Sequence, residues 1–241
     1  MKIEIWTDIA CPWSYIGLNR SQEALDAFEH KADVSVRLRS FQLDPSLPES
    51  YAGSEIDYLA ANKGIDPSRA AAMVQQVAEV GAADGLPFDF AGLAVANSRR
   101  AHRLLHLAQH SDPTGATSWR LKEALFTAHF AEGSSIWDAD SLARLAIQAG
   151  LPEAEARAAL DSAELDAEVA DDIAQAGRLG IHAVPTFVFE DKYGISGAQP
   201  TEAFAQALDQ IWRELNPQPL ITLATTGDNP SCGMDGCTPA S

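Results

Sequence analysis

Apolar and polar positions alternate at the amino terminus and then change to a helical spacing. Residues 2–7 (KIEIWT) are rich in β-branched and aromatic side chains, which predicts a strand. A short turn follows, and Pro12 stands where a helix would begin, because the first helical turn leaves its N–H groups unpaired. The apolar spacing predicts a helix over residues 13–30, and alternation over residues 34–41 predicts a second strand. The chain therefore opens with a β-α-β unit.

The middle of the chain predicts helices and no strands. Alanine is frequent from residue 43 to about residue 180, and proline and glycine separate the helical segments. The expected helices cover residues 56–62, 67–83, 94–110, 117–131, 139–149, 152–160 and 164–178. Strands are expected at residues 184–189 and 193–196, with a last helix over residues 201–215. This order indicates an α/β fold with β-α-β and β-β-α halves and a large α-helical insertion.

The same pattern predicts how the chain is divided. Residues 1–43 and 164–215 are expected to form one domain, and residues 44–163 an inserted α-helical subdomain. Residues 216–241 are rich in Pro, Thr, Asn and Gly, which predicts a C-terminal tail. With 241 residues, 46% of them hydrophobic, the chain is long enough to bury an ordinary core without disulfide support.

Charge and hydropathy exclude some classes of partner. Lys and Arg number 17 and Asp and Glu 34, for a net charge of −17, so a nucleic acid would be repelled by most of the surface. No window approaches the roughly 18 uninterrupted apolar residues that a membrane span needs. The amino terminus also lacks the basic start and long apolar stretch of a secretory signal. We therefore expect a cytoplasmic protein without membrane contact.

Cys11 lies at the predicted start of the first helix. Unpaired backbone amides and the helix dipole favour an anion there, so we expect the pKa of this thiol to be lowered and its thiolate to attack disulfides. Ser14 stands one helical turn later, where a second cysteine would resolve the mixed disulfide. Its hydroxyl can donate a hydrogen bond but cannot expel a bound partner. The pattern predicts a monothiol centre that captures partners and releases them slowly; an inert turn cysteine is the alternative.

Two further groups of residues are candidates for chemistry. Cys232 and Cys237 are spaced to form a small reactive disulfide, although a passive pair or a zinc site would use the same residues. His102, His106 and His110 share one face of a predicted helix. We interpret them as a partly solvated stripe and predict no metal site, because no carboxylate or cysteine stands beside them in the sequence. His102 is also a candidate proton carrier near the reactive thiol.

Several motifs together resemble the FrnE subfamily of DsbA-like oxidoreductases. They are Ile9-Ala10-Cys11-Pro12-Trp13-Ser14-Tyr15-Ile16-Gly17, Asn97 with Ala101-His102-Arg103-Leu104, Val184-Pro185-Thr186-Phe187-Val188-Phe189 and Ile195-Ser196-Gly197-Ala198-Gln199-Pro200. The resemblance spans nearly the whole chain and includes the C-x4-C of the tail. Members of the subfamily typically carry Cys-Pro-Trp-Cys, so Ser14 is a departure that argues against dithiol oxidase activity.

The resemblance implies a thioredoxin fold interrupted by the helical insertion. Cys11 would be the nucleophile and Pro185 would face it with a cis peptide bond, while Val184 would offer backbone hydrogen bonds to an extended peptide. Further substrate-binding residues implied by these motifs are Pro12, Trp13, Asn97 and His102. No cofactor is implied, with glutathione as a conceivable co-substrate.

Three functions follow from these residues. The leading hypothesis is thiol–disulfide exchange on proteins or small thiols, with Cys232 and Cys237 as an auxiliary redox pair. A glutathione-dependent isomerase is the first alternative, since 2-hydroxychromene-2-carboxylate isomerases share the scaffold that the resemblance implies. A chaperone-like module that binds apolar peptides without redox activity is the second, because a fold does not determine a function. The oligomeric state is left open.

Overall fold

A four-stranded mixed sheet forms the centre of the protein. The computed structural model describes residues 1–217, 231–233 and 236–238. The strands are β1 (Lys2–Thr7), β2 (Ser35–Ser40), β3 (Thr186–Phe189) and β4 (Tyr193–Ser196), in the spatial order β2-β1-β3-β4. β1 runs parallel to β2 and antiparallel to β3, and β3 runs antiparallel to β4. This is the sheet of a thioredoxin fold, as predicted.

Most of the helices come between β2 and β3 in the sequence. They are α1 (Pro12–Ala27), α2 (Glu55–Lys63), α3 (Pro67–Ala83), α4 (Arg99–Ser111), α5 (Ala116–Phe130), α6 (Ala139–Gln148), α7 (Glu153–Ala159), α8 (Ala163–Arg178) and α9 (Thr201–Leu215), with a 3-10 turn at Lys31–Asp33. Local chemistry explains their ends. Ser54 and Asp57 form a reciprocal capping box at the start of α2, and Gly64 ends that helix in the left-handed region.

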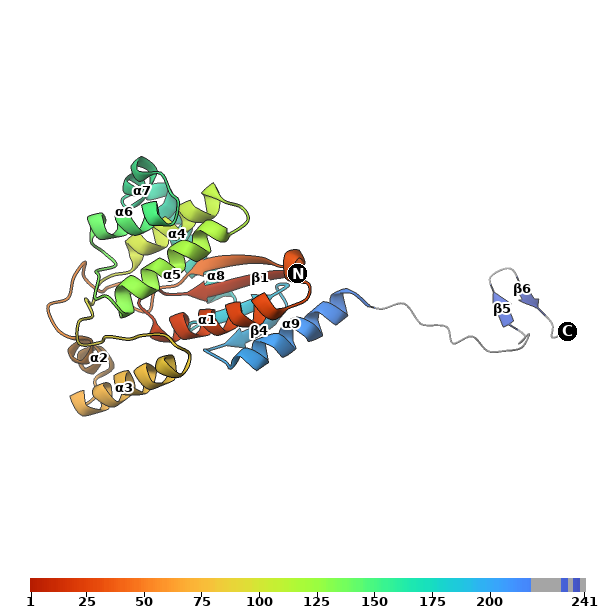
Figure 1. Ribbon diagram of the computed structural model, residues 1–241, viewed down its shortest axis with the longest axis horizontal. Coiled ribbons are helices and arrows are strands. Elements are labelled where there is room, and N and C mark those ends of the chain that lie inside the picture. The colour runs from red at the N-terminus through yellow and green to blue at the C-terminus, as the bar shows by residue number, and fades with distance from the viewer. Residues whose placement is uncertain (218–230, 234–235, 239–241) are drawn as a thin grey trace.

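The two faces of the sheet are covered by different helices. Ile3 and Ile5 share one face of β1 and line a small cavity with side chains from α1 and α9. On the other face, the Trp6 indole donates to the backbone oxygen of Asp172 in α8. In Figure 1, α4 to α7 form a block on one side of the molecule, and α2 and α3 lie apart from that block.

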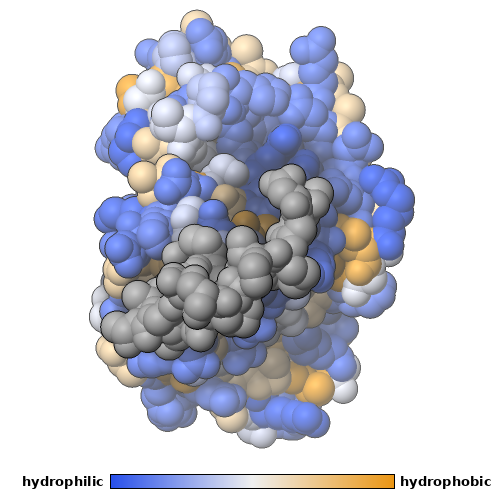
Figure 2. Space-filling view, turned by 90° about the vertical axis from the view of Figure 1, so that its right-hand side faces the viewer, coloured by the Kyte–Doolittle hydropathy of each residue, from blue (hydrophilic) through white to orange (hydrophobic). Residues whose placement is uncertain are grey.

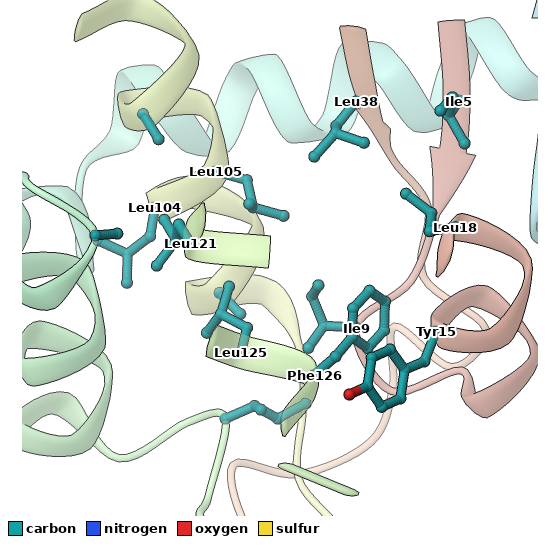
Figure 3. Packing of buried hydrophobic residues seen from close by; sticks show 14 of the residues in the cluster. Ile5, Ile9, Tyr15, Leu18, Leu38, Leu104, Leu105, Leu121, Leu125 and Phe126 are labelled. Atoms are coloured by element: carbon teal, nitrogen blue, oxygen red, sulfur yellow. The ribbon is translucent and has the colours of Figure 1, made fainter. Parts of the chain in front are cut away.

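The hydrophobic core continues from the sheet into the helical insertion. Ile9 and Tyr15, from the start of the chain, pack with Phe126 of α5, and the rings of Tyr15 and Phe126 stack at 5.1 Å (Figure 3). The Tyr15 hydroxyl lies 3.3 Å from the Thr127 hydroxyl. The insertion therefore shares its core with the loop that carries Cys11, so it can position that loop. The proposed domain boundaries themselves stay a prediction.

One predicted helix begins later than expected. The apolar pattern predicted a helix over residues 94–110, but α4 begins at Arg99. The preceding segment is extended, because Tyr51 donates its backbone N–H to the Val95 oxygen and Asn97 donates its backbone N–H to Pro48. Pairing with a distant loop has replaced the helical hydrogen bonds that the local pattern favours.

The surface is consistent with the acidic composition. The face in Figure 2 is mostly hydrophilic, and its hydrophobic residues lie in small separate patches. Within residues 1–217 and the two short strands of the tail, no helix is long and apolar enough to cross a membrane.

Candidate active site around Cys11

Cys11 is positioned by the junction of β1 and α1. It is the N-cap residue of α1, its backbone N–H donates to Asp8, and Pro12 opens the helix. The side chain is buried, with 4% of its surface exposed. The thiol lies 3.7 Å from the backbone oxygen of Val184, to which it can donate its proton. The sequence thus predicted the place of the sulfur at the helix start.

Pro185 follows Val184 in the loop that contacts the Cys11 sulfur. The Val184–Pro185 peptide bond is cis, as the resemblance implied, and the Pro185 oxygen accepts the N–H of Gly197 at 2.8 Å. Gly17 of α1 lies directly against this loop. A Cβ atom at Gly17 would stand 2.7 Å from Pro185 Cγ and 3.2 Å from the Cα of Ala198. A side chain at position 17 would therefore push the proline away from the reactive helix.

The structure reverses the predicted direction of the Cys11 pKa. Burial is the largest influence and, together with the charge of Asp8, raises the pKa of Cys11 to about 11. Hydrogen bonds from the side chain and backbone of Ser14 and from the backbone of Trp13 act in the opposite direction. The helix-start amides do stabilise a thiolate, as expected, but desolvation outweighs them. The resting centre is a protonated thiol at neutral pH.

Asp8 is a buried carboxylate beneath this centre. It accepts hydrogen bonds from the backbone N–H groups of Ala10 at 3.1 Å and Leu43 at 2.8 Å, and it lies 3.4 Å from Nε2 of His102. Burial would raise the pKa of Asp8, but the contact with His102 and the Leu43 amide keep it below its usual value. Asp8 therefore holds a negative charge next to Cys11.

The three histidines of α4 are more deeply buried than the partly solvated stripe that their spacing predicted. His102 and His106 are buried, and only His110 is largely exposed, with 50% of its side-chain surface accessible. Carboxylates from distant segments meet them: Glu168 and Asp172 of α8 each lie 3.1 Å from a His106 ring nitrogen. Among the residues that the structure describes, no group of side chains has the arrangement of a metal site.

A cavity of about 390 Å³ opens beside Cys11. Pro12, Trp13 and Val184 line it, and their part in binding a substrate stays a prediction. Its other walls come from α2 and the segment before it, α3, the segment that precedes α4, α5 and the residues before Pro185. They include Asp44, Leu47, Glu55, Tyr58, Leu59, Asn62, Lys63, Met73, Val74, Gln76, Val77, Phe90, Val95, Ala96, Ser98, His129 and His182. The helical insertion therefore encloses a space next to the sulfur that suits a small molecule or a short side chain.

Two predicted substrate-binding residues do not line this cavity. Asn97 is buried, donates to the Leu47 oxygen at 2.7 Å and accepts from the Gln42 amide at 3.0 Å. His102 is also buried and faces Asp8. Their polar groups hold loops together, so neither side chain is placed to contact a substrate in the cavity.

Sequence reasoning missed two groups of the cavity wall. Glu55 lies in the first turn of α2, where burial raises its pKa to about 7 against the charge of Lys63. His129 of α5 is buried, and its Nδ1 has no hydrogen-bond partner. Neither residue belongs to a motif, so only their convergence on Cys11 in three dimensions reveals them.

The tail cysteines fall at the edge of what the structure describes. β5 (Ser231–Gly233) and β6 (Gly236–Thr238) form an antiparallel hairpin in which Cys232 is directly opposite Cys237. The predicted disulfide, a link to Cys11 and zinc binding all concern side chains that lie outside the described part of the tail.

Comparison with known proteins supports the fold. A family model described as a DSBA-like thioredoxin domain matches residues 2–209. The crystal structure of a probable DsbA oxidoreductase from Streptomyces coelicolor has 38% sequence identity and a TM-score of 0.82, with 100% of each chain covered. No curated protein matches the chain.

Two more distant structures share the fold. The cytosolic disulfide reductase DsbM from Pseudomonas aeruginosa, solved with GSH, has 21% identity and a TM-score of 0.64, with 88% of this chain and 100% of DsbM covered. A 2-hydroxychromene-2-carboxylate isomerase has 15% identity and a TM-score of 0.66, with 89% of this chain and 98% of the isomerase covered. At these identities the likeness concerns the fold alone.

Proposed function

Because the chain belongs to the family of DSBA-like thioredoxin domains, we propose that it catalyses thiol–disulfide exchange through the sulfur of Cys11. The observation that carries this proposal is the place of that sulfur. It lies at the start of α1, 3.7 Å from the Val184 oxygen of the cis-proline loop and at the wall of a cavity. A disulfide bound in that cavity can reach the sulfur.

The proposed reaction has two exchange steps. The Cys11 sulfur attacks one sulfur of the substrate disulfide, a new S–S bond forms, and the other substrate sulfur leaves and takes up the proton that Cys11 loses. Ser14 has no thiol with which to break this mixed disulfide. A thiol molecule from solution therefore attacks the substrate sulfur of the mixed disulfide, restores Cys11 as a thiol and stays joined to that half of the substrate. Each cycle consumes one thiol, releases one thiol and exchanges one disulfide for another.

The proposal extends to the subfamily, the tail and the compartment. The motifs around Cys11 and Pro185 support membership of the FrnE subfamily. The opposed positions of Cys232 and Cys237 support an auxiliary redox pair that passes electrons to or from the centre. A monothiol centre needs a supply of reduced thiols, which supports action in the cytoplasm, the compartment that the name of DsbM gives for that protein.

The test follows the mixed disulfide by intact-protein mass spectrometry in a Cys232→Ser/Cys237→Ser variant. After mixing with a small disulfide, we expect one adduct on Cys11 that persists until a thiol is added and then decays in proportion to the thiol concentration. Ser14→Cys should shorten the life of the adduct by at least about tenfold, because an intramolecular thiol has a high effective concentration.

A matched control distinguishes resolution of the adduct by a thiol at position 14 from unspecific attack by any added thiol. Ser35→Cys adds a thiol on an exposed residue at the far end of β2, where it pairs with Lys2 rather than with the residues near Cys11. It should not shorten the life of the Cys11 adduct. An adduct-free parent under all conditions, or equal adduct lifetimes in the parent and Ser14→Cys, would refute the proposed function.

A glutathione-dependent isomerase is the second candidate. The enclosed cavity beside the helix start favours a small-molecule substrate, which an isomerase would also need. Isomerisation should survive Cys11→Ser and require glutathione, whereas thiol–disulfide exchange should be lost in that variant.

A further inference from the structure

The charges on the cavity wall are unbalanced. Asp8, Asp44 and Glu55 contribute carboxyl groups to the wall, whereas Lys63 is the only lysine or arginine among the described residues that line it. Asp8 and Asp44 have pKa values below the usual one, Asp44 because the Ser46 hydroxyl and the Tyr58 hydroxyl donate to it. The wall of the reactive cavity therefore has an excess of negative charge.

An unpartnered imidazole gives a second, independent indication. His129 lines the cavity with 2% of its surface exposed, and its Nδ1 has no hydrogen-bond partner. Burial lowers the pKa of His129 to about 4, so the ring is neutral at physiological pH. The backbone of Ser134 acts in the opposite direction and favours the charged ring, but burial outweighs it. A neutral imidazole has one nitrogen that donates and one that accepts, so a ligand in the cavity can complete the hydrogen bonding that Nδ1 lacks.

The cavity wall therefore suits a ligand that donates hydrogen bonds. Carboxylates accept hydrogen bonds, as does the unprotonated nitrogen of a neutral imidazole. An ammonium group on a ligand can donate to these acceptors and offset the charge of the carboxylates. A ligand with several carboxylates would meet like charges in a partly enclosed space, where repulsion is weakly screened. A cation near Cys11 would also oppose the effect of Asp8 and favour loss of the thiol proton.

We propose that this cavity selects small disulfides that carry ammonium groups and disfavours anionic ones, glutathione disulfide included. The proposal deepens the proposed function and rests on it. In the selected reaction Cys11 attacks cystamine, the mixed disulfide of Cys11 with cysteamine forms, and one cysteamine leaves with the proton from Cys11. The ammonium group that stays attached lies among the carboxylates.

Glu55 makes this preference dependent on pH. Its carboxyl group changes charge near pH 7, so the negative charge of the wall increases as the pH rises through neutrality. The other ionisable groups of the cavity wall lie on its own helix, on the segment before that helix and on other elements; they are Lys63 and Tyr58, then Asp44, then Asp8, Cys11, His129 and His182. The residues of α3 that line the cavity carry no ionisable group; they are Met73, Val74, Gln76 and Val77.

The experiment compares three disulfides of similar size in the full chain. They are cystamine, which is dicationic, hydroxyethyl disulfide, which is neutral, and dithiodipropionate, which is dianionic. The rate of adduct formation on Cys11 is measured by peptide mass spectrometry and divided by the rate of the same disulfide with an uncharged small thiol. This division removes differences in intrinsic reactivity, and the ratio between disulfides removes the common effect of pH on Cys11.

The expected order is cystamine, then hydroxyethyl disulfide, then dithiodipropionate, with about tenfold between the first and second at low ionic strength. Added salt should reduce the difference. The ratio of cystamine to hydroxyethyl disulfide should rise severalfold between pH 6 and pH 8. Equal normalised rates, or a preference for the anion, would overturn the proposal.

Variants test the origin of the pH effect. Glu55→Gln should abolish the rise between pH 6 and pH 8, whereas Glu155→Gln, which removes an exposed carboxylate of α7, should leave it unchanged. A rise that persists in Glu55→Gln but disappears in His182→Gln would overturn the assignment to Glu55. Absence of any Cys11 adduct with all three disulfides refutes the proposed function itself, which distinguishes that failure from a loss of selectivity.

Discussion

The pH dependence of Cys11 alkylation tests the central electrostatic feature of this protein. Burial and the charge of Asp8 raise the pKa of this thiol from an ordinary value of 9.0 to about 11. Two pKa units correspond to about 2.7 kcal/mol in favour of the protonated form. The thiolate fraction at pH 7 is then about one in ten thousand, roughly a hundredfold less than for an exposed thiol.

The assay measures the rate of iodoacetamide modification between pH 6 and pH 11 in the Cys232→Ser/Cys237→Ser variant. We expect the rate to increase about tenfold per pH unit up to about pH 10 and to begin to level off only near pH 11, because only the thiolate reacts. The same chain unfolded in urea should level off near pH 9. Limited access to a buried sulfur lowers the rate at every pH but does not move the inflection, so the profile separates accessibility from ionisation.

Two substitutions should move the inflection in opposite directions. Asp8→Asn removes the negative charge and should lower the pKa of Cys11. Ser14→Ala removes the side-chain hydrogen bond that stabilises the thiolate and should raise it. Circular dichroism at each pH confirms that the fold is intact.

A rate in the folded protein that levels off below pH 8 would refute this reasoning. It would mean that the amides at the start of α1 outweigh desolvation. An Asp8→Asn profile identical to that of the parent would show that this carboxylate does not influence the sulfur.

Two further predictions concern packing and stability. Gly17→Ala should lower the free energy of unfolding by about 1–3 kcal/mol and slow adduct formation on Cys11, because the added methyl group meets Pro185 at 2.7 Å; denaturant unfolding and the adduct assay measure the two effects. Lys122→Met should stabilise the protein by roughly 2–4 kcal/mol at pH 6, because burial lowers the pKa of this lysine from 10.5 to about 7. The pKa of Lys122 is lower in the folded protein than in the unfolded chain, so the advantage of methionine should shrink as the pH rises from 7 to 10.5, where the unfolded lysine also loses its proton. An advantage that does not change over this range would contradict the assignment.

Local sequence determined the elements and the place of the reactive sulfur. The alternation in residues 2–7, the proline at the start of α1 and the glycine that ends α8 act over a few residues, so their effects can be read from neighbours in the chain. α3 has the predicted bounds, and Cys11 lies at the helix start as expected. The cis bond at Pro185 followed from the resemblance rather than from local chemistry.

Tertiary structure decided the electrostatics and the shape of the site. The pKa of Cys11, the burial of His102 and the charges around the cavity depend on which distant residues are brought together and on how much water they exclude. Glu55 and His129 are 44 and 118 positions along the chain from Cys11, and each belongs to a helix that would form without the other. Helix and strand signals are local, whereas desolvation and Coulomb interactions depend on distances in space. For this reason the sequence alone indicated a lowered pKa for Cys11, and the folded protein raises it.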